Sequence, residues 1–274
     1  LRWDLYKELG YPEIKNLDDM VDVLAQMKEL CPTDDNGKTT YGVSLFADWD
    51  GDMVMLGDRY ESQLCAIEMN AGCLIISMNT QPNDSILKLA EDYEDIHFIL
   101  SKDTKMSPNF MKKHGIPERA KKCIEYVIPD KKYEIGKVKV KTLRSTDAGV
   151  AFLVKTCGKT IYHAGDLHNW KMEHVGELIN GKMERDYRHQ IRKLEGEHIN
   201  VAFVVLDPRL GVYTDLGLAY FMKNVEADYV FPMHMWQDYS AIEKYKQKCD
   251  NHLYTDRIMD IEKENQVFDM DNLK

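Results

Sequence analysis

The chain of 274 residues has no long apolar run, no closely spaced cysteine pair and no cluster of basic residues. Its longest apolar runs, such as Ala71 to Ile76, are far shorter than the roughly 20 residues that cross a bilayer. We therefore expect no membrane segment. No apolar leader follows Leu1, and Leu1 is not a methionine, so we expect a cytoplasmic protein whose N-terminus is truncated or internal.

The cysteine and charge content excludes two further classes of protein. The six cysteines lack CxxC spacing, which is typical of buried free thiols in a reducing compartment. The net charge of -10, without any basic run, argues against a nucleic-acid-binding surface. Hydrophobic residues make up 44% of the chain, which is enough for a sizeable core.

The first segment that the sequence does contain is residues 1–58, which have their own pattern. Apolar residues between Leu17 and Leu30 recur at helical spacing, with Asn16 placed to cap the helix and Asp19 to complete a capping box. A polar turn at 33–38 and a short strand at 41–46 are expected next.

This segment resembles a slice of a bacterial extracellular solute-binding protein of the sugar-transporter type. The resemblance rests on RWDLYKELGYPEIKNLDDMVDVLAQMKEL, DDNGK and YGVSLFADWDGD, and it covers about a fifth of the chain. It implies that an aromatic residue such as Trp49 can stack on a sugar ring. The alternative is that Trp3 and Trp49 are packing residues.

Residues 59–77 form a junction with little pattern apart from an apolar strand at 73–77, and from residue 84 onward strands and helices alternate. Strands are expected at 96–100, 138–140, 149–154, 159–163, 201–206, 229–231 and 266–268, and helices at 84–93, 107–115, 181–194, 216–225 and 240–248. Antiparallel hairpins mixed with strand-helix units favour an α/β (α+β) fold with helices on the outer faces of the sheets.

Two strand ends carry residue types that bind divalent metal ions. One strand runs from Thr160 to His163 and then through Gly165 to an acidic residue, Asp166. The other ends in Pro-Met-His-Met-Trp, with His234 at its centre. A carboxylate and an imidazole that strand ends present together are ligands by which metal-dependent hydrolases hold an ion.

From about residue 73 to 270 the chain resembles the metallo-β-lactamase superfamily, in the branch of small hydrolases near the lactonase-like members. The matching segments are STDAGVAFLVKTCGKTIYHAGDL, VAFVVLDPRLG and VFPMHMW. The resemblance implies a four-layer αββα sandwich with one or two metal ions, usually zinc, at one edge of the sheets. It also implies hydrolysis of an ester, lactone, amide or phosphodiester by metal-bound hydroxide. We therefore expect an incomplete αββα sandwich over residues 78–274, with an N-terminal appendage of helix and strand.

The resemblance also implies roles for single residues. Asp166 matches the aspartate that bridges two metals and serves catalysis, and His234 matches the last histidine ligand. Asp147 lies where many relatives carry a middle histidine, which makes it a candidate third ligand. His163, His168 and Arg209 are further candidates, which contact either the metal ligands or the substrate. For Arg209 the alternative is that it holds a loop in place.

The superfamily's first ligand motif, HxHxDH, is absent from this chain. Its place before the helix at 84–93 is occupied by SMNTQPND at residues 77–84, and no histidine precedes His97. Because a catalytic zinc needs about three protein ligands, we expect at most one weakly bound zinc, with manganese or iron as alternatives, and impaired hydrolysis. A frame error or assembly junction upstream of residue 84 is one explanation of the loss.

Two alternatives to an impaired hydrolase follow from the same observations. The first alternative is a non-catalytic protein that is truncated or chimeric. The second is a sugar-binding fragment formed by residues 1–58. Since few residues remain to build the first sheet, we also expect an exposed sheet edge and homo-oligomerisation. The expected ligand is a small molecule that the sequence does not identify, because variable loops form such pockets.

Overall fold

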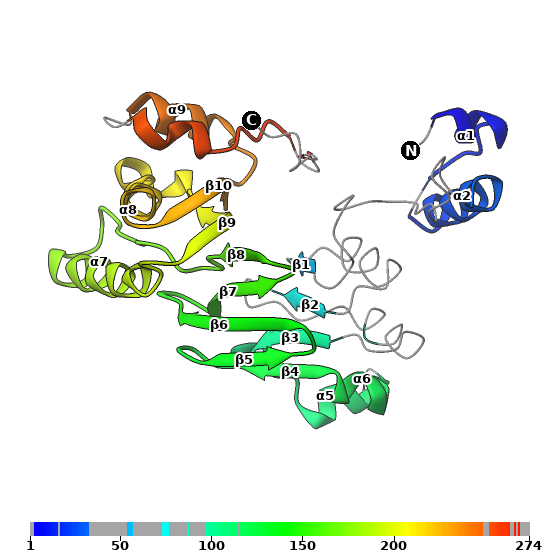
Figure 1. Ribbon diagram of the computed structural model, residues 1–274, viewed down its shortest axis with the longest axis horizontal. Helices are drawn as coiled ribbons and strands as arrows, with labels where there is room; N and C mark the ends of the chain where they lie inside the picture. The colour runs from blue at the N-terminus through cyan, green and yellow to red at the C-terminus, as the bar shows by residue number, and fades with distance from the viewer. Residues whose placement is uncertain are drawn as a thin grey trace. The chain divides into compact units, whose positions relative to one another are not determined.

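The computed structural model describes residues 3–15, 17–32, 54–56, 73–76, 87, 97–113, 115–248, 252–263, 266 and 268 (Figure 1). The chain divides into two compact units, one of residues 1–50 and 267–274 and one of residues 51–266.

The smaller unit contains two helices, α1 (Trp3–Glu8) and α2 (Leu17–Leu30). The helix expected at 17–30 is confirmed, and Val23 and Met27 are its buried positions. The carboxylate of Asp19 accepts the backbone N–H of Lys15 at 2.9 Å, so it does bind the chain just before the helix. Three expected features lie outside the described residues, namely the Asn16 cap, the strand at 41–46 and Trp49.

The larger unit contains a parallel sheet of four strands in the order β1-β2-β3-β4. Its strands are β1 (Val54–Leu56), β2 (Cys73–Ile76), β3 (His97–Ser101) and β4 (Ile124–Val127). The 3-10 helix η1 (Lys102–Thr104) and the helices α5 (Pro108–Lys113) and α6 (Glu118–Lys122) connect β3 to β4. Phe98, Ile99 and Leu100 are all fully buried, as is typical of a parallel strand that is covered on both faces.

A second, mixed sheet has six strands in the order β10-β9-β8-β7-β6-β5. Its strands are β5 (Lys132–Ile135), β6 (Val138–Arg144), β7 (Val150–Thr156), β8 (Lys159–His163), β9 (His198–Val205) and β10 (Glu226–Met233). Strands β5 to β8 are antiparallel neighbours, and the hairpin expected around Cys157 and Gly158 is confirmed between β7 and β8. Strands β8, β9 and β10 are parallel.

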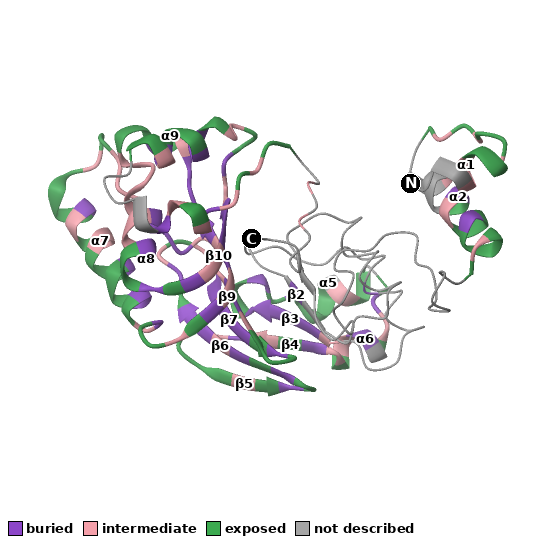
Figure 2. Ribbon diagram, turned by 45° about the horizontal axis from the view of Figure 1, so that its top comes forward, coloured by how far each residue is buried: buried purple, intermediate pink, exposed green. Residues whose placement is uncertain are grey.

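Helices connect the parallel strands, because a parallel pair needs a long crossover. These elements are α7 (Glu177–Arg192) between β8 and β9, then η2 (Pro208–Tyr213) and α8 (Leu216–Asn224) between β9 and β10. After β10 come α9 (Ser240–Lys248) and η3 (His252–Arg257). Figure 2 shows buried residues along the strands and exposed residues on the outer sides of α7 and α9.

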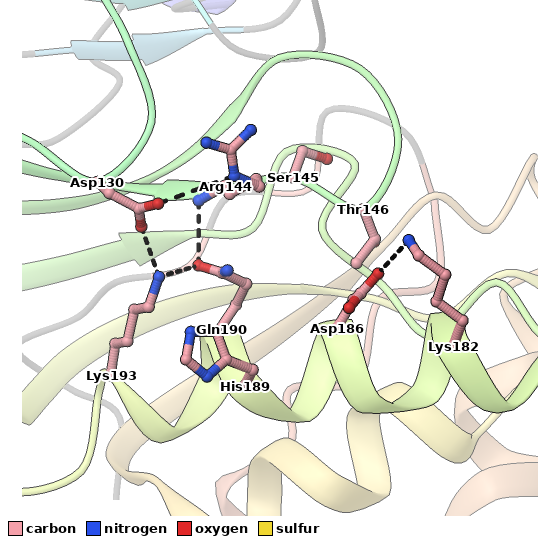
Figure 3. A pocket seen from close by; sticks show the side chains of 9 residues that line it. All are labelled: Asp130, Arg144, Ser145, Thr146, Lys182, Asp186, His189, Gln190 and Lys193. Carbon is pink, nitrogen blue, oxygen red and sulfur yellow. Dashed lines mark hydrogen bonds and ion pairs between the residues drawn. The ribbon is translucent and has the colours of Figure 1, made fainter.

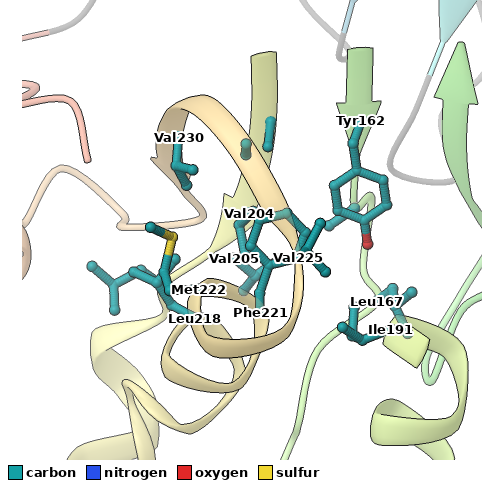
Figure 4. Packing of buried hydrophobic residues seen from close by; sticks show 14 of the residues in the cluster. Tyr162, Leu167, Ile191, Val204, Val205, Leu218, Phe221, Met222, Val225 and Val230 are labelled. Atoms are coloured by element: carbon teal, nitrogen blue, oxygen red, sulfur yellow. The ribbon is translucent and has the colours of Figure 1, made fainter. Parts of the chain in front are cut away.

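The main hydrophobic core lies between the six-stranded sheet and these helices. Figure 4 shows side chains of α7 and α8 meeting those of β8 and β9. The rings of Tyr162 and Phe221 stack with their centroids 5.4 Å apart, and the Tyr187 hydroxyl donates to the Gly217 carbonyl at 2.8 Å. Full burial of an aromatic or aliphatic side chain of this size contributes about 1.5–3 kcal/mol.

The fold class agrees with the sequence, and the expected last strand does not. The mixed α/β class is confirmed, whereas Gln266 and Phe268, the residues described in the expected strand at 266–268, are not in a strand. The outer edge of β10 is instead met by a single bridge between Val230 and Ile258, and the Met259 N–H donates to the Val230 carbonyl at 2.9 Å. Within the described ranges, no helix has the length and apolarity needed to span a membrane.

Candidate functional site

Three neighbouring parallel strands end at one edge of the six-stranded sheet, and each is followed by a polar side chain. Asp166 follows β8, Asp207 follows β9 and His234 follows β10. The carboxyl ends of adjacent parallel strands are the usual place for a ligand site in α/β sheets. The topology therefore brings together residues that are far apart in the chain.

The backbone turns sharply where β8 and β10 end. Gly165 has a φ of 54°, and a Cβ there would lie 2.9 Å from the Val150 carbonyl oxygen, so the turn before Asp166 requires glycine. His234 itself has a φ of 71°, and Trp236 has a φ of 53°. Left-handed backbone at residues other than glycine costs about 1 kcal/mol or more and is concentrated at functional sites.

His234 lies between the two carboxylates. Its Nδ1 is 3.0 Å from Asp207 Oδ2, and its Nε2 is 3.5 Å from Asp166 Oδ1. The side chains of His234 and Asp166 are 11% and 15% exposed, so both are open to a small ligand. The hydrogen bond to Asp166 raises the pKa of His234 and burial opposes that rise, while Asp207 adds to it.

Asp207 is fully buried and is held by Arg209. The Arg209 Nε lies 2.9 Å from Asp207 Oδ1, its Nη2 lies 2.6 Å from Oδ2, and its backbone N–H donates to Oδ1 at 2.9 Å. Burial alone would raise the pKa of Asp207, but the hydrogen bonds from Arg209 and His234 outweigh burial and leave this pKa below its ordinary range. Asp207 is therefore an ionised acceptor that orients the imidazole.

Two tryptophans flank the imidazole of His234. Trp170 and Trp236 meet it edge to face, with ring centroids 5.5 Å and 5.8 Å away. The Trp170 indole N–H donates to the Asp166 carbonyl oxygen at 2.9 Å, which fixes that ring. Trp236 is 65% exposed, and the Arg209 guanidinium lies over its ring at 4.3 Å. The aromatic rings thus restrict the imidazole to one plane.

The geometry of Asp166 and His234 fits two corners of a zinc site. With zinc bonds of about 2.0–2.2 Å, two tetrahedral ligand atoms lie roughly 3.4 Å apart, close to the observed 3.5 Å between Asp166 Oδ1 and His234 Nε2. Asp207 at Nδ1 matches the carboxylate that orients a histidine ligand in many metal sites. Yet no group of three or more metal-binding side chains is formed among the described residues. These residues alone do not complete a catalytic zinc site, and residues 77–84 lie outside the described ranges.

The structure places Asp147 differently from the resemblance. Asp147 is exposed in the loop after β6, where its backbone N–H donates to the Ser145 hydroxyl at 3.1 Å. Within the described part of the chain, it does not join Asp166 and His234 in a metal-binding group. The position matches the superfamily pattern in sequence, but the carboxylate lies at the surface.

The two histidines near Asp166 have different surroundings. The His163 Nδ1 accepts the Gly165 N–H at 3.0 Å, and burial lowers the pKa of His163 to about 4 against the opposing charge of Asp166. His168 is fully buried, and both of its ring nitrogens lack a hydrogen-bond partner among the described residues. Burial lowers the pKa of His168 to about 3. Burial therefore favours the neutral imidazole in both residues.

Sequence reasoning missed Asp207, Trp170 and Trp236 as members of the cluster. The signal for Asp207 was present, because it directly follows the apolar strand expected at 201–206 and precedes a proline. The alternative that Arg209 pins a loop agrees with its contacts to Asp207. The tryptophans carried no sequence signal, since their contacts with His234 depend on the turn that follows each strand.

Comparison with solved structures shows a distant similarity to metallo-β-lactamase-fold proteins. The metallo-β-lactamase fold protein YhfI from Bacillus subtilis is 10% identical to this chain, with a TM-score of 0.44. The match covers 74% of this chain and 84% of the YhfI chain. Zinc-bound PqqB from Methylobacterium extorquens is 11% identical to this chain, with a TM-score of 0.37. The match covers 70% of this chain and 73% of the PqqB chain. CmlA, a diiron β-hydroxylase from Streptomyces venezuelae, is 11% identical with a TM-score of 0.37, and the match spans 35% of its length.

Comparison with protein families gives a match in the N-terminal half. Residues 43–106 match the model of the DRTGG domain, and no curated protein matches the chain. None of the comparisons supports the resemblance of residues 1–58 to a solute-binding protein. The matched range includes residues 77–84, which occupy the place of the absent HxHxDH motif. The similarity to the DRTGG domain is therefore confined to this segment of the chain.

Proposed function

We propose that this protein is a metal-dependent hydrolase of the metallo-β-lactamase type whose activity is reduced because its metal centre is incomplete. Asp166 and His234 are the proposed ligands, and Asp207 is the residue that orients His234. The single observation that carries the proposal is the 3.5 Å separation of Asp166 Oδ1 and His234 Nε2, with His234 Nδ1 held by a buried carboxylate.

The same pair of atoms can hold either a proton or a cation. With Nδ1 donating to Asp207, a neutral His234 presents the lone pair of Nε2 toward Asp166, as a metal ligand requires. When Nε2 is protonated, the imidazolium instead forms an ion pair with Asp166. Metal binding therefore competes with protonation at this nitrogen.

The expected reaction class is hydrolysis of an ester, lactone or phosphodiester, in which a bound metal ion supplies the activated water. Asp166 and His234 alone would hold such an ion weakly, because a catalytic zinc normally has three protein ligands. The contribution of this chain is to fix the imidazole through Asp207 and Arg209 and to shield one side of it with Trp170. We therefore expect low turnover.

The test is the metal content and metal affinity of the full chain. Elemental analysis of the purified protein and calorimetric titration with zinc and manganese are compared for wild type, Asp166→Asn and His234→Ala. We expect one weak site in wild type and none in either variant. After the protein is loaded with metal, its hydrolysis of a nitrophenyl ester, a lactone and a phosphodiester is assayed.

A matched control lies at the opposite ends of the same strands. His198 at the start of β9 has its Nε2 3.2 Å from Asp228 Oδ2 of β10, which is the same kind of contact with greater exposure. His198→Ala and Asp228→Asn should leave the metal site unchanged. The proposal would be contradicted if wild-type protein bound neither ion. It would also be contradicted if the control variants lost the ion to the same extent as Asp166→Asn and His234→Ala.

A second candidate function is supported by the charge balance of the cluster. The pKa of His234 is raised by its hydrogen bond to Asp166, so an imidazolium between two carboxylates is a self-contained ion network. In that case the residues stabilise the sheet edge of a non-catalytic protein. Asp166→Asn would then lower the melting temperature while the metal content of wild-type protein stays at zero.

A further inference from the structure

A polar cavity separate from the Asp166–His234–Asp207 cluster lies between the end of β6 and helix α7 (Figure 3). Its volume is about 420 Å³, within the range of small-molecule sites. Its lining includes Asp130, Arg144, Lys182, Asp186, Gln190 and Lys193. The α7 residues recur at helical spacing, so one face of this helix forms a wall of the cavity.

The amide of Gln190 presents a fixed hydrogen-bond donor to this cavity. Gln190 is 5% exposed, and its Oε1 accepts both the Arg144 backbone N–H at 3.2 Å and the Lys193 Nζ at 2.8 Å. Flipping the amide would place its NH₂ group against two donors, so the orientation is determined. Nε2 then faces the cavity, and no bond from it to another described residue is formed. Nε2 can therefore donate a hydrogen bond to a ligand that enters the cavity.

The charges around the cavity are positive on balance. Arg144, Lys182 and Lys193 face two carboxylates, Asp130 and Asp186, which leaves a local charge of +1 in a chain of net charge -10. Asp130 pairs with Lys193 at 2.5 Å and Asp186 with Lys182 at 2.8 Å. The Arg144 Nε is 3.8 Å from Asp130 Oδ2, and the Arg144 side chain is 64% exposed. Arg144 therefore keeps donors for a ligand.

We propose that this cavity binds a small phosphorylated polyhydroxy compound, such as a sugar phosphate. The donors at Gln190, Arg144 and Lys182 approach from β6 and from two turns of α7, which suits an oxyanion with three acceptor oxygens. The carboxylates of Asp130 and Asp186 can accept hydroxyl groups of the same ligand. The cavity is large enough for more than a free ion.

The test is calorimetric titration of the full chain with ribose 5-phosphate, ribose and inorganic phosphate. Gln190→Glu keeps an oxygen for Arg144 and Lys193 but replaces the donor with a second carboxylate oxygen. We expect ribose 5-phosphate to bind more tightly than either fragment. We expect Gln190→Glu to weaken its binding by about tenfold or more, and Lys182→Ala to weaken it severalfold.

The control is Lys223→Ala, an exposed lysine of α8 that does not line the cavity. Thermal melts of each variant confirm that it is folded, and Lys182→Ala keeps the test valid should Gln190→Glu fail to fold. Wild type that shows no saturable binding would overturn the proposal. So would equal binding of inorganic phosphate and ribose 5-phosphate, or equal weakening by Lys223→Ala. The lining excludes Asp166, Asp207 and His234, so the result does not depend on a metal centre.

Discussion

At the scale of single residues, the site is organised around a line of contacts from the surface to the imidazole. Trp236 lies against Arg209, Arg209 binds Asp207, and Asp207 binds His234. Each contact restricts the next side chain, because a guanidinium fork and a carboxylate meet in one plane. The exposed residues of this line thus control the orientation of a buried one.

Arg209→Ala should destabilise the protein by about 2 kcal/mol, because it leaves the buried Asp207 carboxylate with His234 as its remaining side-chain partner. Arg209→Lys should recover part of this loss, since an ammonium does not form the two-pronged contact. Chemical denaturation measures both variants. Arg188→Ala is the control, because Arg188 also lies over an aromatic ring and pairs with a carboxylate, but at the surface. An equal loss in both alanine variants would contradict the role of Arg209.

Gly217→Ala should destabilise the protein by about 1–3 kcal/mol, although alanine normally stabilises a helix relative to glycine. A Cβ at Gly217 would lie 2.3 Å from the Nδ1 of the buried His168 ring. In a His168→Ala background the same change should become stabilising, and a double-mutant cycle of unfolding free energies measures this reversal. Gly181→Ala in α7 is the control, since the nearest atom there is at 3.5 Å and belongs to a flexible arginine. A stabilising Gly217→Ala in wild type would be inconsistent with this packing.

At the scale of elements, the six-stranded sheet carries both the core and the site. Its antiparallel half is built from hairpins, and its parallel half from the crossovers through α7 and α8. The crossovers cover one face of the sheet and leave the strand ends open. Two predictions test how these elements are held together.

Tyr162→Phe should stabilise the protein by about 1 kcal/mol, because the Tyr162 hydroxyl is buried without a hydrogen-bond partner among the described residues. Tyr187→Phe is the matched comparison. It removes a hydroxyl that donates to the Gly217 carbonyl at 2.8 Å, so it should destabilise by about 1 kcal/mol. Thermal and denaturant unfolding measure both changes. Opposite signs are expected, and equal effects would show that the two hydroxyls have equivalent surroundings.

The ion pairs that Lys141 of β6 and Lys155 of β7 form with Glu197, the residue before β9, should give a pH-dependent contribution to stability. The hydrogen bond from Lys155 lowers the pKa of Glu197, with burial opposing and Lys141 adding to the shift. A carboxylate with a lowered pKa stabilises the fold above its unfolded pKa, and this contribution disappears as the pH falls through the folded pKa. Glu197→Gln should therefore cost about 0.5 kcal/mol at pH 7 and nothing in acid. Glu134→Gln in β5, which is exposed, should change little at either pH.

At the scale of the whole molecule, both sheets end in strands that have one paired neighbour among the described residues. Within the described residues, β4 and β5 are edge strands that pair with a neighbour on one side each. Glu125 of β4 and Lys132 of β5 are exposed there, and such charges oppose the pairing of edges.

We predict weak self-association of the full chain through an open sheet edge, with a mass that rises with concentration. Light scattering at several concentrations measures the mass, and raising the salt concentration should strengthen association by screening the edge charges. A monodisperse monomer at all concentrations would contradict this prediction.

Residues with a strong local signal were predictable from the sequence. The helix at 240–248 and the hairpin around Gly158 follow from periodicity and turn residues, and the structure confirms both. Asp166 and His234 were singled out because each follows an apolar strand. The strand expected at 266–268 was wrong for Gln266 and Phe268, which are not in a strand.

The sequence by itself thus determined the α/β class, most elements after residue 96 and the two strand ends that carry the proposed ligands. Only the tertiary structure decided that β8, β9 and β10 are parallel neighbours, which places His234 between the carboxylates of Asp166 and Asp207. It also decided that Asp147 lies at the surface and that Gln190 presents a donor to a cavity. The physical reason is that local patterns report which face of an element is buried, whereas strand order and register depend on contacts between residues far apart in the chain.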